Sequence, residues 1–372
     1  DGLGTKDSVQ TQSFTVTVSA TGAVTVNRAA GTDRYDTGLI ISQHQWADKG
    51  AITPDAKGRT GQAKAVVLST GNAFPDALAG VPLAKKANGP LLLTDGMANT
   101  LNPAVLAEIQ RILPTKDTTV YVLGGEKAIS AGIESQLTKL GFTVKRLAGA
   151  DRYATALTIA KEGMGDPSHV IVARGDEGKD HDGFADALAA GPYAANVWGH
   201  GNSAVVLSNF KVLDPNTAAY VGSKIKADQL NVAAVGGQAV AAVQVLPGAV
   251  QAHQDSTGKW VGTFGAAYGP DRYATAQAVA AAFRPAGERD RVGVATGLQF
   301  PDALTGGAYM ATIGGPLLLT DPKALPAPTL GALVDVAGKT PEIDIFGGSA
   351  AVSDSVAKAI AAVVKVTAIG KF

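Results

Sequence analysis

One seven-residue pattern, Gly-x-Asp-Arg-Tyr-x-Thr, occurs three times in this chain of 372 residues. It covers residues 31–37, 149–155 and 269–275, and its aspartates lie 118 and 120 residues apart (151 − 33 and 271 − 151). A period of this length is too long for a solenoid of short units and matches the size of a whole small domain. The chain is therefore expected to contain three copies of one domain.

Three further segments follow each copy in the same order. The first contains Asp-Ala-Leu, the second is a short apolar run, and the third ends in Gly-Gly. In the three units they cover residues 71–78, 91–95 and 122–125, then 183–188, 205–209 and 234–237, then 297–304, 317–321 and 345–348. We predict repeats at residues 23–146, 147–266 and 267–372, because four signals recur in one order.

Residues 1–22 lie outside the repeats. Residues 12–19 alternate apolar and polar side chains, which predicts a half-buried strand. We expect this segment to be a linker or the end of an upstream β-domain. Since the chain begins with Asp1 and not with Met, we expect either a mature fragment or an engineered fragment.

Within each unit, short apolar runs alternate with helical patterns. In the first unit, residues 65–69, 90–94 and 120–123 are apolar throughout, as parallel strands covered on both faces are. Helices are predicted over residues 33–46, 75–83, 102–113 and 130–140. This alternation predicts an α/β fold of three tandem Rossmann-like, doubly wound parallel-sheet units. Related strands precede each Asp-Arg-Tyr copy, and a final one over residues 363–369 is expected to complete the third sheet.

The composition excludes several classes of function. Lys and Arg total 32, as do Asp and Glu, so the chain lacks the positive charge typical of nucleic-acid binders. There is no cysteine, which excludes disulfides, thiolate zinc sites and cysteine nucleophiles. No apolar run approaches the ~20 residues of a membrane-spanning helix. We therefore expect no nucleic-acid partner, no membrane span and no cofactor.

The candidate binding residues are charged side chains that recur in all three units. The motif aspartates are expected to cap helix N-termini. The motif arginines either form structural salt bridges with the aspartates of the second segment or point outward to bind phosphate or carboxylate. The candidate ligand-binding residues are Arg34, Arg152, Arg272, Asp76, Asp186, Asp302, Asp33, Asp151 and Asp271.

The Gly-Gly pairs allow two interpretations. Their N–H groups can bind an anion, as in dinucleotide and phosphate sites. Alternatively, they form a tight strand-to-helix turn that requires positive φ, which is the interpretation we favour because the longer glycine fingerprint is missing.

Unit two carries an acidic insertion at residues 175–183, which invites a calcium hypothesis. Its spacing matches no calcium loop, so we expect a solvated loop and no metal site. The five histidines occupy no equivalent positions in the units, and serine-elbow, phosphate-loop and metalloprotease motifs are all missing. Because a triplicated enzyme would repeat its acid–base groups, we predict that the protein is not an enzyme.

The ordered set of Asp-Arg-Tyr helix start, Phe-Pro-Asp-Ala-Leu segment, Pro-Leu-Leu-Leu-Thr strand and Val-Leu-Gly-Gly turn resembles cell-wall-binding repeat type 2, over residues ~24–372. The resemblance implies a secreted anchoring module of Gram-positive cell-surface and S-layer proteins, in which three repeats form a compact pseudo-trimer. It implies non-covalent binding of a wall glycopolymer, thought to be anionic, or of peptidoglycan, beside a separate surface-exposed domain. We expect weak sites around the arginines to bind the polymer together.

Two features depart from this pattern, and two other functions remain as alternatives. Arg28 and Arg146 have no counterpart before unit three, where Thr263-Phe264 stands, and the net charge of zero is low for a polyanion binder. The first alternative is a self-assembling or adhesive surface-layer protein. The second is a wall-polymer-processing enzyme with its site near Asp176 to Asp186.

Overall fold

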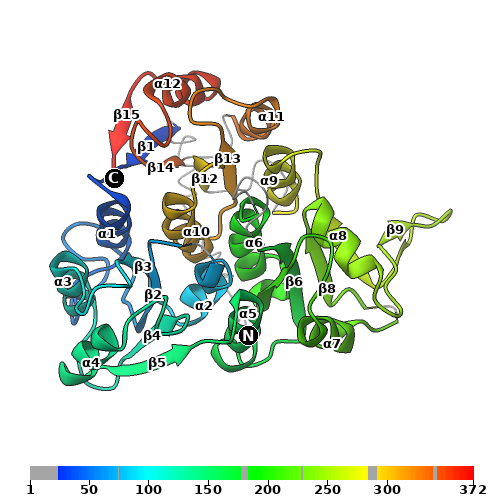
Figure 1. Ribbon diagram of the computed structural model, residues 1–372. Coiled ribbons are helices and arrows are strands. Elements are labelled where there is room, and N and C mark those ends of the chain that lie inside the picture. The colour runs from blue at the N-terminus through cyan, green and yellow to red at the C-terminus, as the bar shows by residue number, and fades with distance from the viewer. Residues whose placement is uncertain (1–23, 74, 177–182, 228, 284–290, 338–341) are drawn as a thin grey trace, which may run out of the picture.

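The computed structural model describes residues 24–73, 75–176, 183–227, 229–283, 291–337 and 342–372. These residues form three parallel sheets with helices on both faces of each, which confirms the triplicated α/β fold (Figure 1). Central strands such as β2 (Ala65–Thr70) are buried along their whole length, because helices cover both of their faces.

The first sheet has the strand order β3-β2-β4-β5. Its other strands are β3 (Leu91–Thr94), β4 (Thr119–Leu123) and β5 (Thr143–Leu147). The helices of this unit are α1 (Arg34–Gln45), α2 (Gly80–Lys86), α3 (Pro103–Ile112) and α4 (Ala131–Lys139). Asn102 and Ser130 cap α3 and α4 with their side chains, so both helices begin where the sequence predicts.

The second sheet repeats this topology, in the order β11-β8-β6-β7. Its strands are β6 (His169–Arg174), β7 (Ser203–Ser208), β8 (Val232–Val235) and β11 (Phe264–Ala267). The helices of this unit are α5 (Arg152–Thr158), α6 (Ala185–Asn196), α7 (Pro215–Lys224) and α8 (Gly237–Gln244), with a π-helical turn over Ile159–Gly163 after α5. A short antiparallel hairpin, β9 (His253–Gln254) and β10 (Trp260–Val261), connects α8 to β11.

The third sheet has five strands, in the order β13-β12-β14-β1-β15. They are β12 (Arg291–Thr296), β13 (Leu317–Thr320), β14 (Glu342–Phe346), β1 (Thr25–Ala29) and β15 (Ile369–Lys371). The helices of this unit are α9 (Arg272–Ala281), α10 (Pro301–Ile313), α11 (Ala327–Val336) and α12 (Asp354–Val363).

The strand before each Asp-Arg-Tyr copy belongs to the sheet of the preceding unit. β5 pairs with β4 in the first sheet, and β11 pairs with β8 in the second. In the third sheet this position is taken by β1, which pairs with β14 (Figure 1). The prediction that residues 363–369 form the completing strand was therefore wrong: α12 extends to Val363, and β15 pairs with β1 at the sheet edge.

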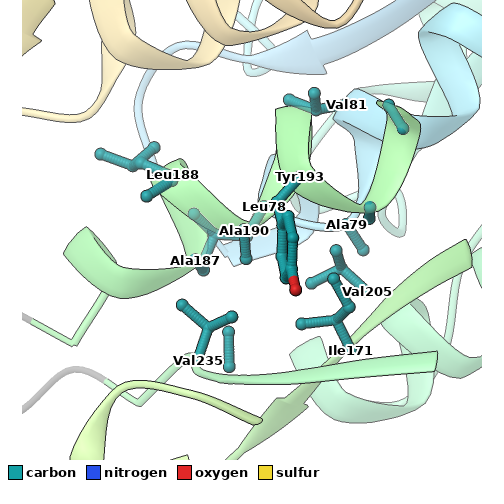
Figure 2. Packing of buried hydrophobic residues seen from close by; sticks show 14 of the residues in the cluster. Leu78, Ala79, Val81, Ile171, Ala187, Leu188, Ala190, Tyr193, Val205 and Val235 are labelled. Atoms are coloured by element: carbon teal, nitrogen blue, oxygen red, sulfur yellow. The ribbon is translucent and has the colours of Figure 1, made fainter. Parts of the chain in front are cut away.

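Helices α2, α6 and α10 pack against one another at the centre of the molecule, one from each unit. A small residue allows the close approach of α6 and α2, since a Cβ at Gly191 would lie 2.8 Å from Cβ of Val81. On the side of α6 that faces the second sheet, Ala187 and Ala190 lie beside the larger Tyr193 (Figure 2). One apolar core runs through all three units at this centre. Separate clusters fill the outer faces of the first and third sheets. The units thus form one pseudo-threefold body around the central helices.

The helix predicted over residues 75–83 is interrupted. Residues Pro75–Ala77 form a 3₁₀ turn, and α2 begins only at Gly80. Pro82 has no N–H to donate to the carbonyl of Leu78, which removes one bond that would join the two segments. The proline is not sufficient by itself, since the equivalent Pro192 lies inside an unbroken α6.

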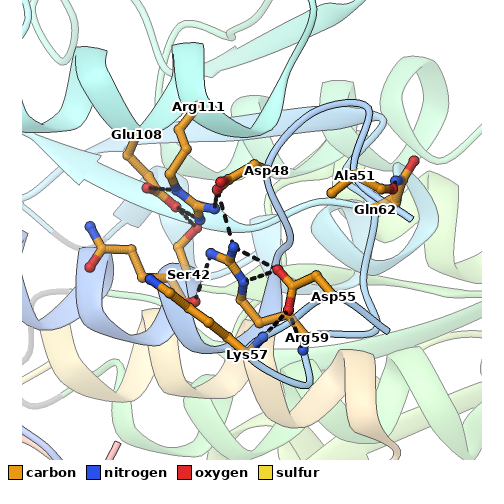
Figure 3. A network of polar contacts seen from close by, with 10 residues as sticks. Ser42, Asp48, Ala51, Asp55, Lys57, Arg59, Gln62, Glu108 and Arg111 are labelled. Carbon is orange, nitrogen blue, oxygen red and sulfur yellow. Dashed lines mark hydrogen bonds and ion pairs between the residues drawn. The ribbon is translucent and has the colours of Figure 1, made fainter. Parts of the chain in front are cut away.

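The loop between α1 and β2 is held by ionic contacts around the buried Arg59 side chain (Figure 3). The Arg59 side chain is only 7% exposed and contacts Asp55 at 2.6 Å and Asp48 at 3.2 Å. Asp48 also pairs with Arg111 of α3 at 2.6 Å. Arg111 in turn binds the buried Glu108, at 2.7 Å. The network fixes the loop to helix α3.

Candidate functional site

The motif aspartates cap the first helix of each unit, as the sequence predicts. Oδ1 of Asp33 accepts hydrogen bonds from the backbone N–H groups of Tyr35 and Asp36, both at 2.8 Å. Asp151 and Asp271 each accept one from the alanine three residues later, also at 2.8 Å. All three aspartates remain exposed. The caps therefore fix helix starts while leaving a carboxylate at the surface.

The motif arginines brace a loop of their own unit. Nη1 of Arg152 donates to the carbonyl of Gly175 at 3.0 Å, and that of Arg272 donates to Gly297 at 2.6 Å. Arg34 donates in the same way to Gly71, and its guanidinium also lies over the ring of Phe300 at 5.8 Å. Each arginine thus ties the helix start to the loop that follows the first strand of the unit.

The aspartates of the second segment face the next unit. The carboxylate of Asp76 in unit one accepts a hydrogen bond from the hydroxyl of Thr155 in unit two, near Arg152. The carboxylate of Asp302 in unit three is placed in the same way beside Thr37 and Arg34 of unit one. Arginine and aspartate therefore meet at the junctions between units.

Burial raises the pKa of both Asp76 and Asp302, and the threonine hydroxyl and the arginine charge oppose this rise. The threonine is itself oriented by the backbone, because its hydroxyl accepts a hydrogen bond from the backbone N–H of the motif glycine. The distance from the glycine N to the threonine Oγ1 is 3.1 Å for Gly31 and Thr37, 3.1 Å for Gly149 and Thr155, and 3.2 Å for Gly269 and Thr275.

The Gly-Gly pairs form the tight turn expected from their sequence. The first glycine has a φ of 91° at Gly124, 94° at Gly236 and 110° at Gly347, a region that L side chains rarely adopt. A Cβ at these positions would also overlap the carboxylates of Asp76, Asp186 and Asp302, respectively. The turn therefore has glycine for two reasons, its conformation and the close approach of an aspartate.

Pockets lie at the junctions. The pocket between units one and two has a volume of about 530 Å³, and the one between units two and three about 320 Å³. Each is lined by the second-segment aspartate and the Gly-Gly loop of one unit and by the Asp-Arg start and threonine of the next. The candidate residues of these two junctions thus lie together. At the third junction, between units three and one, Asp302 interacts with Thr37 and Arg34.

Sequence reasoning missed Arg174, which lines the pocket between units two and three. It ends strand β6 at the position where β2 and β12 have Thr70 and Thr296. Its guanidinium binds Asp176 through two hydrogen bonds of 2.6 and 2.9 Å and lies 5.1 Å from the ring of Phe210. The sequence contains a signal for this position: Thr70, Arg174 and Thr296 each directly precede the glycine whose carbonyl accepts a hydrogen bond from the motif arginine.

Arg28 and Arg146 brace the Gly-Gly turns. Arg146 donates to the carbonyl of Gly124 at 2.8 Å, and Arg28 donates to that of Gly347 at 3.4 Å. The strand register places Ala266, not Thr263-Phe264, at the equivalent position of the second sheet. The sequence-based alignment of Thr263-Phe264 with Arg28 and Arg146 was therefore wrong. The equivalent position of the second sheet still has no arginine.

Residues 177–182 of the acidic insertion lie outside the described residues, so its calcium hypothesis stays a prediction. In the described ranges, no group of three or more His, Asp or Glu side chains is arranged to hold a metal ion. Over the same ranges, no helix is long and apolar enough to cross a membrane.

Three segments of the chain, residues 28–134, 146–246 and 267–357, match the family "Cell wall binding domain 2". Among curated proteins of Bacillus subtilis, residues of this chain are 31% identical over 209 positions to "Amidase enhancer" and 32% identical over 170 positions to "N-acetylmuramoyl-L-alanine amidase LytC". These matches cover 55% and 46% of this chain but only 25% and 29% of those proteins.

Two solved structures from Clostridium difficile share the fold. Cwp8 aligns with a TM-score of 0.69 at 23% identity, over 93% of this chain and 52% of its own. Cwp6 aligns with a TM-score of 0.70 at 22% identity, over 92% of this chain and 48% of its own. The chain thus spans about half of each of these structures and less than a third of the curated relatives.

Proposed function

Because the chain belongs to the cell wall binding domain 2 family, we propose that it anchors a surface protein non-covalently to the bacterial cell wall, by binding a wall glycopolymer at the junctions between its repeats. The observation that carries this proposal is the threefold recurrence of one arrangement: a half-buried aspartate of one unit, facing the Asp-Arg helix start of the next.

A repeating polymer suits this arrangement. Three weak sites on one rigid body bind successive units of the same chain, so that the overall affinity exceeds that of any single pocket. The role is binding without catalysis, because the recurring groups are held in structural contacts. Glycine carbonyls hold the arginines, and threonine hydroxyls hold Asp76 and Asp302.

The protein is proposed to act at the cell surface, as one part of a larger secreted protein. The curated relatives support this, since the matched part is about a quarter of a protein called an amidase enhancer and under a third of an amidase. We accordingly propose the repeat boundaries 23–146, 147–266 and 267–372 as those of the anchoring units.

Cosedimentation with purified Gram-positive sacculi tests the proposal. The second glycine of each Gly-Gly pair offers a way to fill the pockets, because a Cβ at Gly125, Gly237 or Gly348 meets no atom within 4 Å. The first two of these glycines line the pockets at the first two junctions. We expect the triple variant Gly125→Trp, Gly237→Trp, Gly348→Trp to fold and to lose at least about tenfold in retention, since linked sites fail together.

Gly222→Trp is the matched control, since a Cβ there also meets no atom within 4 Å, and Gly222 lies on α7 outside both pockets. The control should pellet like the unmodified protein. Equal pelleting of the triple variant would overturn the assignment of the site. No pelleting of the unmodified protein with sacculi from several species would overturn wall binding itself.

A further inference from the structure

Building on the proposed function, we propose that the junction pockets bind uncharged, hydroxyl-rich sugar units of the wall polymer through their carboxylates, and not its phosphate or carboxylate groups. This differs from the anionic ligand that the sequence resemblance suggests. Four observations on the junctions carry it.

The first observation is the balance of charge. The pocket between units one and two is lined by three carboxylates (Asp76, Glu126, Asp151) and two cations (Lys127, Arg152). The pocket between units two and three has two of each, Asp186 and Asp271 with Arg174 and Arg272. Arg174 is further neutralised by its two hydrogen bonds to Asp176. Counted over the described residues, neither pocket therefore has the net positive charge that attracts a polyanion.

The second observation concerns the arginines. Anion recognition by arginine uses its planar fork of N–H groups on two oxygens at once. In each unit, Nη1 of the motif arginine donates to a glycine carbonyl of its own unit. The guanidinium is thus held as a structural brace, and part of its fork is already used.

The third observation is the half-buried aspartate at the junction. Asp76 and Asp302 are partly removed from water, and this desolvation raises the pKa of each. A second negative group placed beside such a carboxylate would be repelled in a medium of low dielectric constant. A sugar hydroxyl would instead donate a hydrogen bond to it, a charge-assisted contact that is stronger than a neutral one.

The fourth observation is the exposed carboxylate at the pocket mouth. Asp151 and Asp271 line the two pockets, and each caps its helix through Oδ1 while its side chain stays exposed. At the third junction, Asp33 likewise caps its helix through Oδ1 and stays exposed. A carboxylate can accept hydrogen bonds from two neighbouring hydroxyls of one sugar ring, and it repels a phosphate.

The caps allow a test in which the two ligand classes give opposite results. Asparagine caps helices as well as aspartate does, so the triple variant Asp33→Asn, Asp151→Asn, Asp271→Asn removes three negative charges and keeps the helix starts. We expect its melting temperature to match that of the unmodified protein. Its retention by intact sacculi should fall at least about threefold, because three linked acceptors weaken together.

The control is Asp214→Asn, since Asp214 also caps a helix but lines neither pocket. A salt series gives a second readout: from about 50 to about 500 mM NaCl, retention of the unmodified protein should change less than about twofold. Competition with N-acetylglucosamine should release more protein than phosphate at equal ionic strength.

Stronger or unchanged retention of the triple asparagine variant would overturn this inference, and so would a steep loss of binding with salt. The proposed wall binding would survive either result, because the unmodified protein would still pellet. Failure of the unmodified protein to pellet at low salt would instead contradict the proposed function.

Discussion

Asn27 on β1 donates a hydrogen bond of 2.5 Å to the carboxylate of Glu342 on β14, although 315 residues separate the two in the chain. The contact lies where β1, the first strand that the structure describes, enters the sheet of the third repeat. It joins the first repeat to the third, so that the three units form a closed ring.

Removing β1 should therefore destabilise the third unit most. Val26 and Ala29 are 1% and 0% exposed, and β1 pairs with strands on both of its sides. A chain that begins at residue 30 should be less stable than one that begins at residue 24 by at least ~3 kcal/mol, from lost apolar burial and ladder hydrogen bonds. Urea denaturation measures this difference, and equal midpoints would contradict the closing role of β1.

The contribution of Asp344 to the stability of the protein should fall as the pH rises above about 4. This residue is 0% exposed, and its Oδ2 has no hydrogen-bond partner. Burial, and then the charge of Glu342, raise the pKa of Asp344 to about 7, against the opposing effect of Arg291 and a hydrogen bond from Asn27. The protonated form is thus favoured in the folded state, and its stabilising contribution is lost as the pH rises through about 7.

Asp344→Asn should remove this dependence. The variant should be more stable than the unmodified protein at pH 8, by an amount on the order of 1–3 kcal/mol, and the advantage should vanish near pH 4. Thermal melts from pH 4 to pH 8 give the comparison. Asp335→Asn, at an exposed position of α11, is the control and should leave the profile unchanged. The prediction fails if the two variants give the same profile.

The two glycines of one Gly-Gly turn should respond differently to alanine. At Gly236 the φ of 94° is unfavourable for alanine, and its Cβ would overlap the carboxylate of Asp186. At Gly237 a Cβ meets nothing within 4 Å. Gly236→Ala should cost at least ~2 kcal/mol, whereas Gly237→Ala, inside helix α8, should be neutral or slightly stabilising. Chemical denaturation of both variants tests this, and similar losses in the two would refute it.

Arg59 should determine the rigidity of the loop over residues 48–63. Its side chain is buried between Asp48 and Asp55, so Arg59→Ala would leave two carboxylates without this partner (Figure 3). We expect the loop to be cut several times faster by a protease of broad specificity, with a loss of stability of ~1–3 kcal/mol, since Asp48 is partly solvated. Lys57→Ala, in the same loop, is the control and should not change the cleavage rate.

Much of the local structure was predictable from the sequence. The helix starts at Asp33, Asp151 and Asp271 follow from a capping residue before a helical pattern. The buried strands follow from runs of β-branched and leucine residues, and the turn at Gly124 follows from its Gly-Gly pair. Each of these depends on residues that are close together in the chain. The candidate site was only partly predictable: its repeated residues were identified, but Arg174 was missed because it breaks the repeat.

The sequence by itself determined that there are three units, what each is built from and where its helices begin. Only the tertiary structure decided which unit supplies the partner of each side chain. Asp76 faces Thr155 of the next repeat, and β1 completes the sheet of the last one. The physical reason is that periodicity and capping report local geometry, whereas three copies of one motif offer chemically equivalent partners. The choice among them follows from packing α2, α6 and α10 around one centre, which brings the aspartate of each unit against the helix start of the next.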